Sequence, residues 1–431
     1  MCKHINLYKK YNTVITKGLY MKKKVSVLCV VFNHEKYISR ALNSIFSQKT
    51  QFEFEVIVHD DASTDGTKTI LEKYKTRYGK KLKVYYEEEN KYSRGELQDI
   101  LNDIILNEAE GDYIALCEGD DYWLDDNKLQ IQVDYMDNHQ DCVMSGHNSL
   151  WVDNATNEIT VCNGVDSEGS VSISELIGNR NGCFSTASIV LRKEKYVLPK
   201  PFSECGIGDW PMKLYSAEQG YVYYFNRIMS VYNLYTDNSW SKNTLQLTNK
   251  IIHEMDMITF FIKLNCHWNY MYENDIQTQI DSCVNDIIYQ IESKGEIVST
   301  KIADINDLTN RKYQDAYEMI NRKIILREKE DSELKAFVGK HIYNCIMGCG
   351  VKAKKLTEHM QKLNIDIDGY VVSNNQIVPF EYNKKKVWRL RDLPFEKKDV
   401  AVIIGIQSDI RDEIIQSLNE NGFNDFFWPS V

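Results

Sequence analysis

The N-terminal part of the chain alternates short apolar runs with amphipathic segments. Residues 25–32 are apolar and rich in valine, which predicts a buried strand, and apolar side chains then recur at helical spacing through 37–46. The same order of strand and helix returns at 54–78 and at 82–105, and a fourth apolar run covers 113–117. Strands that alternate with helices of about a dozen residues predict a mostly parallel sheet with helices on both faces.

The pattern changes twice in the rest of the chain. Between about 140 and 240 strand-like and helical stretches are mixed, and from 245 to about 335 helical spacing continues without a proline. The last hundred residues return to the alternation of strand and helix. These changes divide the chain into four expected parts: a flexible N-terminal extension (1–20), an α/β domain (21–243), a helical connector (244–335) and a small α/β domain (336–431).

The composition narrows the class of protein. Hydrophobic residues make up 43% and charged residues 26%, as in folded globular proteins. The formal charge of −10 argues against nucleic acid as a partner, because proteins that bind the phosphate backbone carry an excess of Lys and Arg. The eleven cysteines include no C-x-x-C pair, which predicts reduced thiols in a cytosol.

Membrane insertion is not expected. The longest apolar run is far shorter than the ~18–20 residues that cross a bilayer, and residues 1–20 lack the pattern of a signal peptide. We therefore expect a cytoplasmic protein without a transmembrane span. Its N-terminal lysines leave two alternatives, a solvated tail or peripheral contact with an anionic membrane surface.

Two acidic loops follow predicted strands. Asp60 and Asp61 come after the second strand, and Glu118-Gly-Asp120-Asp121 comes after the fourth. Ligands bind beyond the carboxyl ends of strands in such sheets, and like charges ~4 Å apart repel by ~4 kcal/mol at an effective dielectric constant of 20. A divalent cation relieves this repulsion. Oxygen ligands favour Mg²⁺ or Mn²⁺, which leave further positions to substrate phosphates. A solvated or calcium-binding loop is the alternative.

The ordered motifs resemble those of the family-two glycosyltransferases, which have the GT-A fold. The resemblance spans about residues 24–241 and rests on 25–33 (VSVLCVVFN), 58–67 (VHDDASTDGT), 118–123 (EGDDYW) and 208–211 (GDWP), followed by Val231-Tyr232 and Ser239-Trp240-Ser241. It implies metal-dependent transfer of a sugar, with inversion, from a nucleoside-diphosphate sugar, for which a UDP-sugar is the expected donor. The acceptor would be a hydroxyl of a growing glycan, glycolipid or glycoprotein, as in bacterial polysaccharide biosynthesis or protein glycosylation.

The resemblance also implies roles for individual residues. Asp209, before a helix, matches the general base, with a structural helix cap as the alternative. Asp120 and Asp121 would hold Mn²⁺ or Mg²⁺. The nucleotide-sugar would be bound by residues that the motifs share, namely Phe32, Asn33, Asp60, Asp61, Glu118 and Asp120.

The chain departs from the family pattern at two positions. Glu118 stands where the family carries the first Asp of its Asp-x-Asp motif, and Tyr235 stands where family members often carry a His that completes the metal shell. Aromatic faces suit sugar rings, so four residues beside the motifs are candidate sugar or acceptor contacts, with burial as the alternative explanation. They are Trp123, Trp210, Tyr235 and Trp240.

The C-terminal domain carries a partial dinucleotide-binding fingerprint. Gly348-Cys-Gly350-x-x-Ala353 lies between a predicted strand and a predicted helix, but no acidic residue follows the next strand to bind a ribose. The domain resembles small Rossmann-like domains found beside sugar-modifying enzymes, and packing or partner binding is its expected role.

Two alternatives to a transferase stay open: an NAD(P)-binding oxidoreductase and a non-catalytic scaffold. The apolar helices of the connector also allow a homo-oligomer.

Overall fold

The computed structural model describes residues 23–162, 164–179, 183–196, 209–237, 239–374, 381–406 and 410–429. The extension expected at 1–20 lies outside these residues. The chain divides into two compact units, one up to Tyr317 and one from Glu318 onward. Among the described helices, none is long and apolar enough to cross a membrane.

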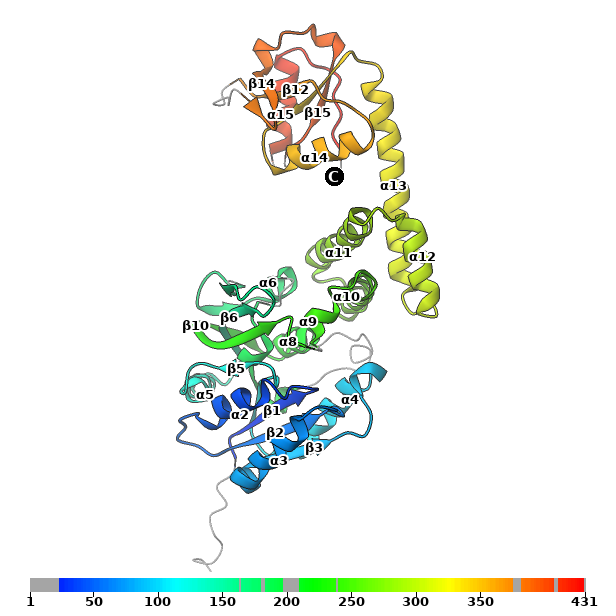
Figure 1. The fold of residues 1–431 in the computed structure, drawn as a ribbon. Helices are drawn as coiled ribbons and strands as arrows, with labels where there is room; N and C mark the ends of the chain where they lie inside the picture. The colour runs from blue at the N-terminus through cyan, green and yellow to red at the C-terminus, as the bar shows by residue number, and fades with distance from the viewer. Residues whose placement is uncertain are drawn as a thin grey trace, which may run out of the picture. The chain divides into compact units, whose positions relative to one another are not determined.

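The first unit contains a mixed sheet of ten strands within the described ranges (Figure 1). Its strands follow the order β3-β2-β1-β4-β9-β6-β10-β5, with β7 on β6 and β8 on β10. The four N-terminal strands run parallel, as the sequence predicts. Their bounds are β1 (Val25–Val31), β2 (Phe54–Asp60), β3 (Leu82–Tyr86) and β4 (Tyr113–Leu116).

Antiparallel pairs enter in the middle of the chain. β9 (Val190–Arg192) runs antiparallel between β4 and β6 (Cys142–Asp153), and β10 (Tyr221–Leu234) runs parallel to β6. β5 (Tyr122–Trp123) pairs antiparallel with β10, which places the residues after β4 beside the end of β10. The short strands β7 (Ile159–Val161) and β8 (Gly169–Val171) complete the sheet.

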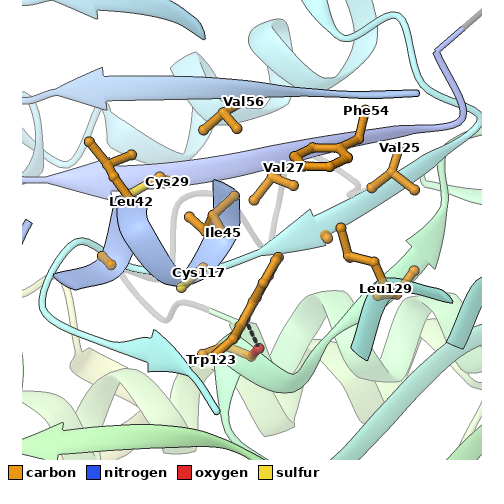
Figure 2. Close-up of a cluster of buried hydrophobic side chains, with 14 of the residues drawn as sticks. Val25, Val27, Cys29, Leu42, Ile45, Phe54, Val56, Cys117, Trp123 and Leu129 are labelled. Carbon is orange, nitrogen blue, oxygen red and sulfur yellow. Dashed lines mark hydrogen bonds between the residues drawn. The ribbon is translucent and has the colours of Figure 1, made fainter. Parts of the chain in front are cut away.

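Helices cover both faces of the sheet. On one face of the sheet, the odd-numbered residues of β1 pack against α2 (Ile38–Phe46), α3 (Thr67–Tyr78) and α5 (Lys128–Asn138). Figure 2 shows Val27, Ile45 and Leu129 in this cluster. On α2 the buried residues recur at helical spacing, which is why this segment forms an amphipathic helix. On the other face His59 lines a shared pocket with Ile100 of α4 (Leu97–Asp103).

Further helices follow the sheet. They are α6 (Ile173–Gly178), α8 (Asp209–Glu218), α9 (Trp240–Asn243), α10 (Leu247–His267), α11 (Glu273–Ser293) and α12 (Val298–Leu308). α10 packs on α11, and α11 packs on α6, so these helices belong to the first unit. The boundaries at 243 and 335 therefore stay predictions.

The second unit is the expected small α/β domain. Its sheet has the order β13-β14-β12-β11-β15, in which β13 alone is antiparallel. The strands are β11 (Tyr343–Met347), β12 (Gly369–Val372), β13 (Glu381–Tyr382), β14 (Lys385–Arg389) and β15 (Val400–Ile404). They pack with α14 (Val351–Lys362) and α15 (Arg411–Glu420), while α13 (Gln314–Val338) spans the division between the units. Near the C-terminus, Phe427 makes a single parallel bridge to Ile403 of β15.

Candidate active site

The loops after β1, β2 and β4 lie side by side at one edge of the sheet. The Asp61 amide donates to the carbonyl of Val31, and the Gly119 amide donates to the carbonyl of Val30, each at 2.9 Å. Asn33 adopts a left-handed backbone conformation, with φ of 56°. Its carboxamide oxygen accepts a hydrogen bond from the amide of Thr64 at 2.7 Å. These bonds bring the predicted nucleotide-binding residues of the first two loops together.

The two adjacent carboxylates of the β2 loop have different surroundings. Asp61 accepts hydrogen bonds at both oxygens, from the amides of Lys91 at 2.6 Å and Tyr92 at 3.0 Å. Asp60 accepts one at Oδ1, from the amide of Ser63 at 3.1 Å. Within the described part of the chain, no residue bonds to Oδ2 of Asp60. Asp61 therefore anchors the loop after β3, while Asp60 keeps an oxygen for a ligand.

The acidic loop after β4 is held by β10 and the residues that follow it. Asp121 Oδ1 accepts a hydrogen bond from the amide of Asn233 at 2.8 Å. Asp120 Oδ2 accepts one from the hydroxyl of Thr236 at 2.7 Å, and His34 Nε2 lies 3.9 Å from the same oxygen. Asp121 Oδ2 is buried without a hydrogen-bond partner.

These carboxyl groups influence one another. Burial, followed by the nearby Asp120 and Asp209, raises the pKa of Glu118 to about 8. Burial, followed by Asp120 and Glu118, also raises the pKa of Asp121 well above its usual value. The pKa of the Tyr232 phenol is raised by burial and by the same four acids. The structure thus gathers Glu118, Asp120, Asp121 and Asp209 around one site.

The carboxyl oxygens of Asp120 and Asp121 are ligands of the kind that a hard divalent cation prefers. Asp121 Oδ2, a carboxyl oxygen that is buried and unpartnered, lies among other carboxyl groups that raise its pKa, and a bound cation would favour its ionised form. Among the residues that the structure describes, no three or more His, Cys, Asp or Glu side chains form a group that could hold a metal ion.

Asp209 begins α8, beside the acidic loop. Its Oδ2 accepts hydrogen bonds from the Thr186 hydroxyl at 2.9 Å and from the Lys213 ammonium at 2.7 Å. Burial acts to raise the pKa of Asp209, but the charge and hydrogen bond of Lys213, with the bond from Thr186, outweigh it and lower the pKa. The carboxylate is therefore ionised near neutral pH and can accept a proton only from an activated or closely held donor.

The candidate aromatic contacts lie in different environments. Trp123 is 4% exposed, belongs to the core in Figure 2 and donates its indole N–H to the carbonyl of Ala187. Trp210 is also buried, and its indole N–H bonds to the carbonyl of Leu176. Trp240 is 45% exposed, with its ring edge-on to His253. The structure leaves only Trp240 among these tryptophans open to solvent.

Replacing Trp123 by alanine is expected to lower the free energy of unfolding by about 3–5 kcal/mol, because the change leaves a cavity in the core. Trp240→Ala is expected to change it by no more than about 0.5 kcal/mol, because the side chain is exposed. Urea denaturation of both variants measures the difference. Equal losses would contradict the placement of Trp123 in the core.

Several site residues escape the sequence analysis. His34 directly follows a quoted motif, while Asn233 and Thr236 lie within two residues of Tyr235, which stands at the family's His position and is a predicted sugar or acceptor contact. The Thr236 hydroxyl bonds to Asp120, whereas the Tyr235 amide bonds to the Ser241 hydroxyl. The sequence signal that could have identified Thr236 is a hydroxyl side chain one residue after position 235, where the family often carries a His. Thr186 lies 23 residues before Asp209 and carries no motif.

The glycine loop of the second unit follows β11. Gly348 has φ of 112°, and a Cβ added at Gly350 would meet only open space. β12 ends at Val372 without an acidic residue, and Asp368 accepts a hydrogen bond from the Asn344 amide at the other end of the strands. Nothing in this arrangement favours the oxidoreductase alternative.

Comparisons with known proteins concern mainly the first unit. Residues 26–154 match the family model "Glycosyl transferase family 2". The uncharacterized protein Rv1520 of Mycobacterium tuberculosis is 32% identical over 225 residues, which are 50% of this chain and 60% of that protein. Poly(ribitol-phosphate) β-N-acetylglucosaminyltransferase TarS of Staphylococcus aureus is 36% identical over 122 residues, 28% of this chain and 20% of TarS. The chain thus matches less than two thirds of the length of these relatives.

Solved structures with similar elements include two transferases. S. aureus TarS 1–349 in complex with UDP-GlcNAc has a TM-score of 0.40 and 19% identity, covering 70% of this chain and 92% of that one. The mannosyltransferase PcManGT of Pyrobaculum calidifontis in complex with GDP-Man and Mn²⁺ has a TM-score of 0.39 and 14% identity, covering 74% and 91%.

Proposed function

We propose that this chain, whose residues 26–154 match the family model of the family 2 glycosyl transferases, transfers a sugar from a nucleoside-diphosphate sugar to a hydroxyl acceptor. The observation that carries the proposal is the buried, unpartnered Asp121 Oδ2 within a group of four carboxylates beside the loops after β1 and β2. Asp120 and Asp121 in this group offer oxygen ligands to a divalent cation that carries a diphosphate, whereas the acidic site repels an anion that arrives without a cation.

Asp120 and Asp121 are the proposed ligands of Mn²⁺ or Mg²⁺. The Thr236 hydroxyl holds the Asp120 carboxylate in place, and His34 Nε2 lies 3.9 Å from the same oxygen. When bound, the ion supplies neutralising charge to the diphosphate as it leaves. Because the ion does this, no protein acid has to protonate the leaving group. Glu118, whose pKa is raised by burial and by the nearby Asp120 and Asp209, would contact the ribose of the donor or help to hold the ion.

The nucleotide is proposed to lie against Phe32, Asn33 and Asp60. A carboxylate accepts hydrogen bonds and donates none when ionised, so Asp60 Oδ2 favours a base or ribose that presents an N–H or O–H. Uracil presents such an N–H, as thymine and guanine also do, so a UDP-sugar, the expected donor, is compatible with this oxygen. TarS, a relative of this chain, is named for N-acetylglucosaminyl transfer, so UDP-GlcNAc belongs in any donor panel.

Asp209 is the proposed general base. The acceptor hydroxyl attacks the anomeric carbon while its proton passes to Asp209, and the bond from that carbon to the diphosphate oxygen breaks with its electron pair leaving on the diphosphate. A single displacement of this kind inverts the configuration at the anomeric carbon. The acceptor class remains a hydroxyl of a glycan, glycolipid or glycoprotein.

Asp60 and Asp61 are expected to respond differently to replacement by asparagine. Asp60→Asn places an N–H₂ where the donor's N–H must bind, so donor affinity is expected to fall about 10- to 100-fold, the worth of a hydrogen bond to a charged group. Asp61→Asn disturbs the cap on Lys91 and Tyr92 and is expected to lower the free energy of unfolding by about 1–3 kcal/mol. Calorimetric titration with UDP and Mn²⁺, and urea denaturation, measure the two effects. The reverse assignment would contradict these roles.

The proposal is tested by incubating the purified full chain with Mn²⁺ and a panel of UDP-, GDP- and dTDP-sugars. Release of the nucleoside diphosphate from at least one donor, dependent on the divalent ion, is the expected result. Failure to bind or hydrolyse every donor, in the presence of Mn²⁺ and of Mg²⁺, would contradict the proposal.

A further inference from the structure

Lys213 is a buried lysine one helical turn beyond Asp209. Its side chain is 2% exposed. Lysine is seldom buried unless its ammonium has a partner, and Lys213 has two. Its ammonium lies 2.7 Å from Asp209 Oδ2 and donates to the carbonyl of Phe184, also at 2.7 Å. It further lies 5.0 Å from the centre of the Phe184 ring. The spacing of four residues, with the acid first, places both side chains on one face of α8.

The hydrogen bonds on Asp209 are unevenly distributed. Lys213 and the Thr186 hydroxyl both bond to Oδ2. Within the described ranges, no other residue donates to Oδ1, and the side chain is 30% exposed. Two donors from different elements therefore fix Oδ2. Apart from the backbone amide of Asp209 itself, which also bonds to the carboxylate, no donor of the described residues competes with a ligand for Oδ1.

We propose that Lys213 is a positioning residue that, with Thr186, fixes Oδ2 of Asp209 and directs Oδ1 toward the acceptor hydroxyl. This inference rests on the proposed function. It goes beyond that function because it assigns part of the catalytic geometry to a lysine that contacts neither donor nor acceptor. The contact with Phe184 supports the assignment, since it anchors the ammonium to the same segment that carries Thr186.

The neighbouring charges explain why a lysine is needed at this place. Glu118 faces Asp209 from the loop after β4, and the Tyr232 phenol faces it from β10. Glu118 is an acid, and the Tyr232 phenol stays neutral because burial and the nearby acids raise its pKa. The nearby Cys183 thiol is also neutral, because burial raises its pKa to about 12. Lys213 is thus the cation that keeps a carboxylate ionised among other acids. Without it, burial and the neighbouring Glu118 act together to favour the protonated form.

The first test replaces Lys213 by methionine, which preserves length and removes the charge. We expect kcat to fall about 10- to 100-fold, the effect of a misplaced catalytic group, with KM for the donor changed by less than about threefold. The acidic limb of the pH profile of kcat is expected to move to higher pH, because Asp209 loses the charge that lowers its pKa. Lys213→Arg is expected to recover most of the rate.

Two further variants separate positioning from folding. Thr186→Val removes the other donor to Oδ2 without burying or removing a charge, so a smaller fall in kcat is expected. Lys128→Met is the matched control, because Lys128 is equally buried but its ammonium has no hydrogen-bond partner in the described structure. Its kcat is expected to stay within about threefold of that of the unmodified chain.

A double-mutant comparison gives the sharpest outcome. If Lys213 acts through Asp209, Lys213→Met combined with Asp209→Asn is expected to be no slower than Asp209→Asn alone, within about twofold. Losses that multiply would overturn the positioning role. So would a Lys213→Met variant as fast as the unmodified chain.

A readout independent of turnover is the titration of the Asp209 carboxyl carbon by NMR, assigned with Asp209→Asn. In the unmodified chain the carboxyl is expected to titrate below its usual range, and in Lys213→Met above it. An unchanged titration would overturn the inference even in an active enzyme. If the unmodified chain turns over no donor, the proposed function fails, and a shifted titration then identifies Lys213 as a structural ion pair only.

Discussion

Asp209→Asn is expected to lower kcat by about 10²- to 10⁴-fold while leaving the affinity for donor and metal nearly unchanged. The substitution keeps the shape of the side chain and its bond from Thr186, but an amide cannot accept the acceptor's proton. Because the carboxylate lies at the start of α8, part of its role could be to complement the helix dipole, which is worth about 0.3–1 kcal/mol. Steady-state kinetics and calorimetric titration with UDP and Mn²⁺ measure the two quantities.

Asp412→Asn is the matched control for the helix-terminus effect. Asp412 is an exposed acid in the first turn of α15, so its replacement removes a similar dipole interaction and changes none of the proposed site residues. Its kcat is expected to stay within about twofold of that of the unmodified chain. A kcat for Asp209→Asn in the same range would identify Asp209 as a structural helix-end residue and contradict its role as a base.

Asp121→Asn is expected to reduce activity by about 10³-fold or more and to abolish stabilisation by Mn²⁺ with UDP. Without metal, the same change is expected to leave the free energy of unfolding unchanged or higher. The reason is that Oδ2 has no hydrogen-bond partner and that Asp120 and Glu118 repel its charge. The Asn side chain keeps an oxygen for the amide of Asn233.

Urea denaturation with and without Mn²⁺ and UDP tests this pair of opposite effects. In the unmodified chain, a ligand present at 100 times its Kd adds about 2.7 kcal/mol to the free energy of unfolding. Asp412→Asn is expected to keep that increment, and Asp121→Asn is expected to lose it. A metal-free Asp121→Asn variant destabilised by more than about 1 kcal/mol, with the increment retained, would show that the carboxylate serves the fold alone.

The parallel half of the sheet follows from the sequence because strand and helix alternate at regular intervals. Valine-rich β1 and the helical spacing in α2 leave few other ways to bury their apolar faces. The meeting of the Asp60 and Asp120 loops follows in turn, since parallel strands place their carboxyl ends at one edge. The second α/β unit is predicted on the same grounds.

The partners of the acidic residues were not predictable in this way. Asn233 and Thr236 reach Asp121 and Asp120 from more than a hundred residues away, through the pairing of β5 with β10. A strand of two residues leaves no periodic signal. The different roles of Asp60 and Asp61 likewise depend on a loop thirty residues distant, whose amides take both oxygens of Asp61.

The aromatic residues and the helical region show a second limit. Tryptophan beside a motif fits either a sugar or a core, and only the packing of the whole unit places Trp123 inside. The spacing of apolar residues predicts a helical connector at 244–335, and helices α10 to α13 lie over this part of the chain, but the spacing does not indicate which unit they join. That depends on contacts such as those between α11 and α6, which are set by tertiary packing.

A crystal of the full chain grown with Mn²⁺ and UDP, with diffraction data collected at the manganese absorption edge, measures the central claim most directly. We predict one anomalous peak about 2.0–2.2 Å from an oxygen of Asp120 and from Oδ2 of Asp121, with the diphosphate on its far side and the base against Asp60. A peak elsewhere on the chain, or nucleotide bound while both aspartates hold no ion, would contradict the account.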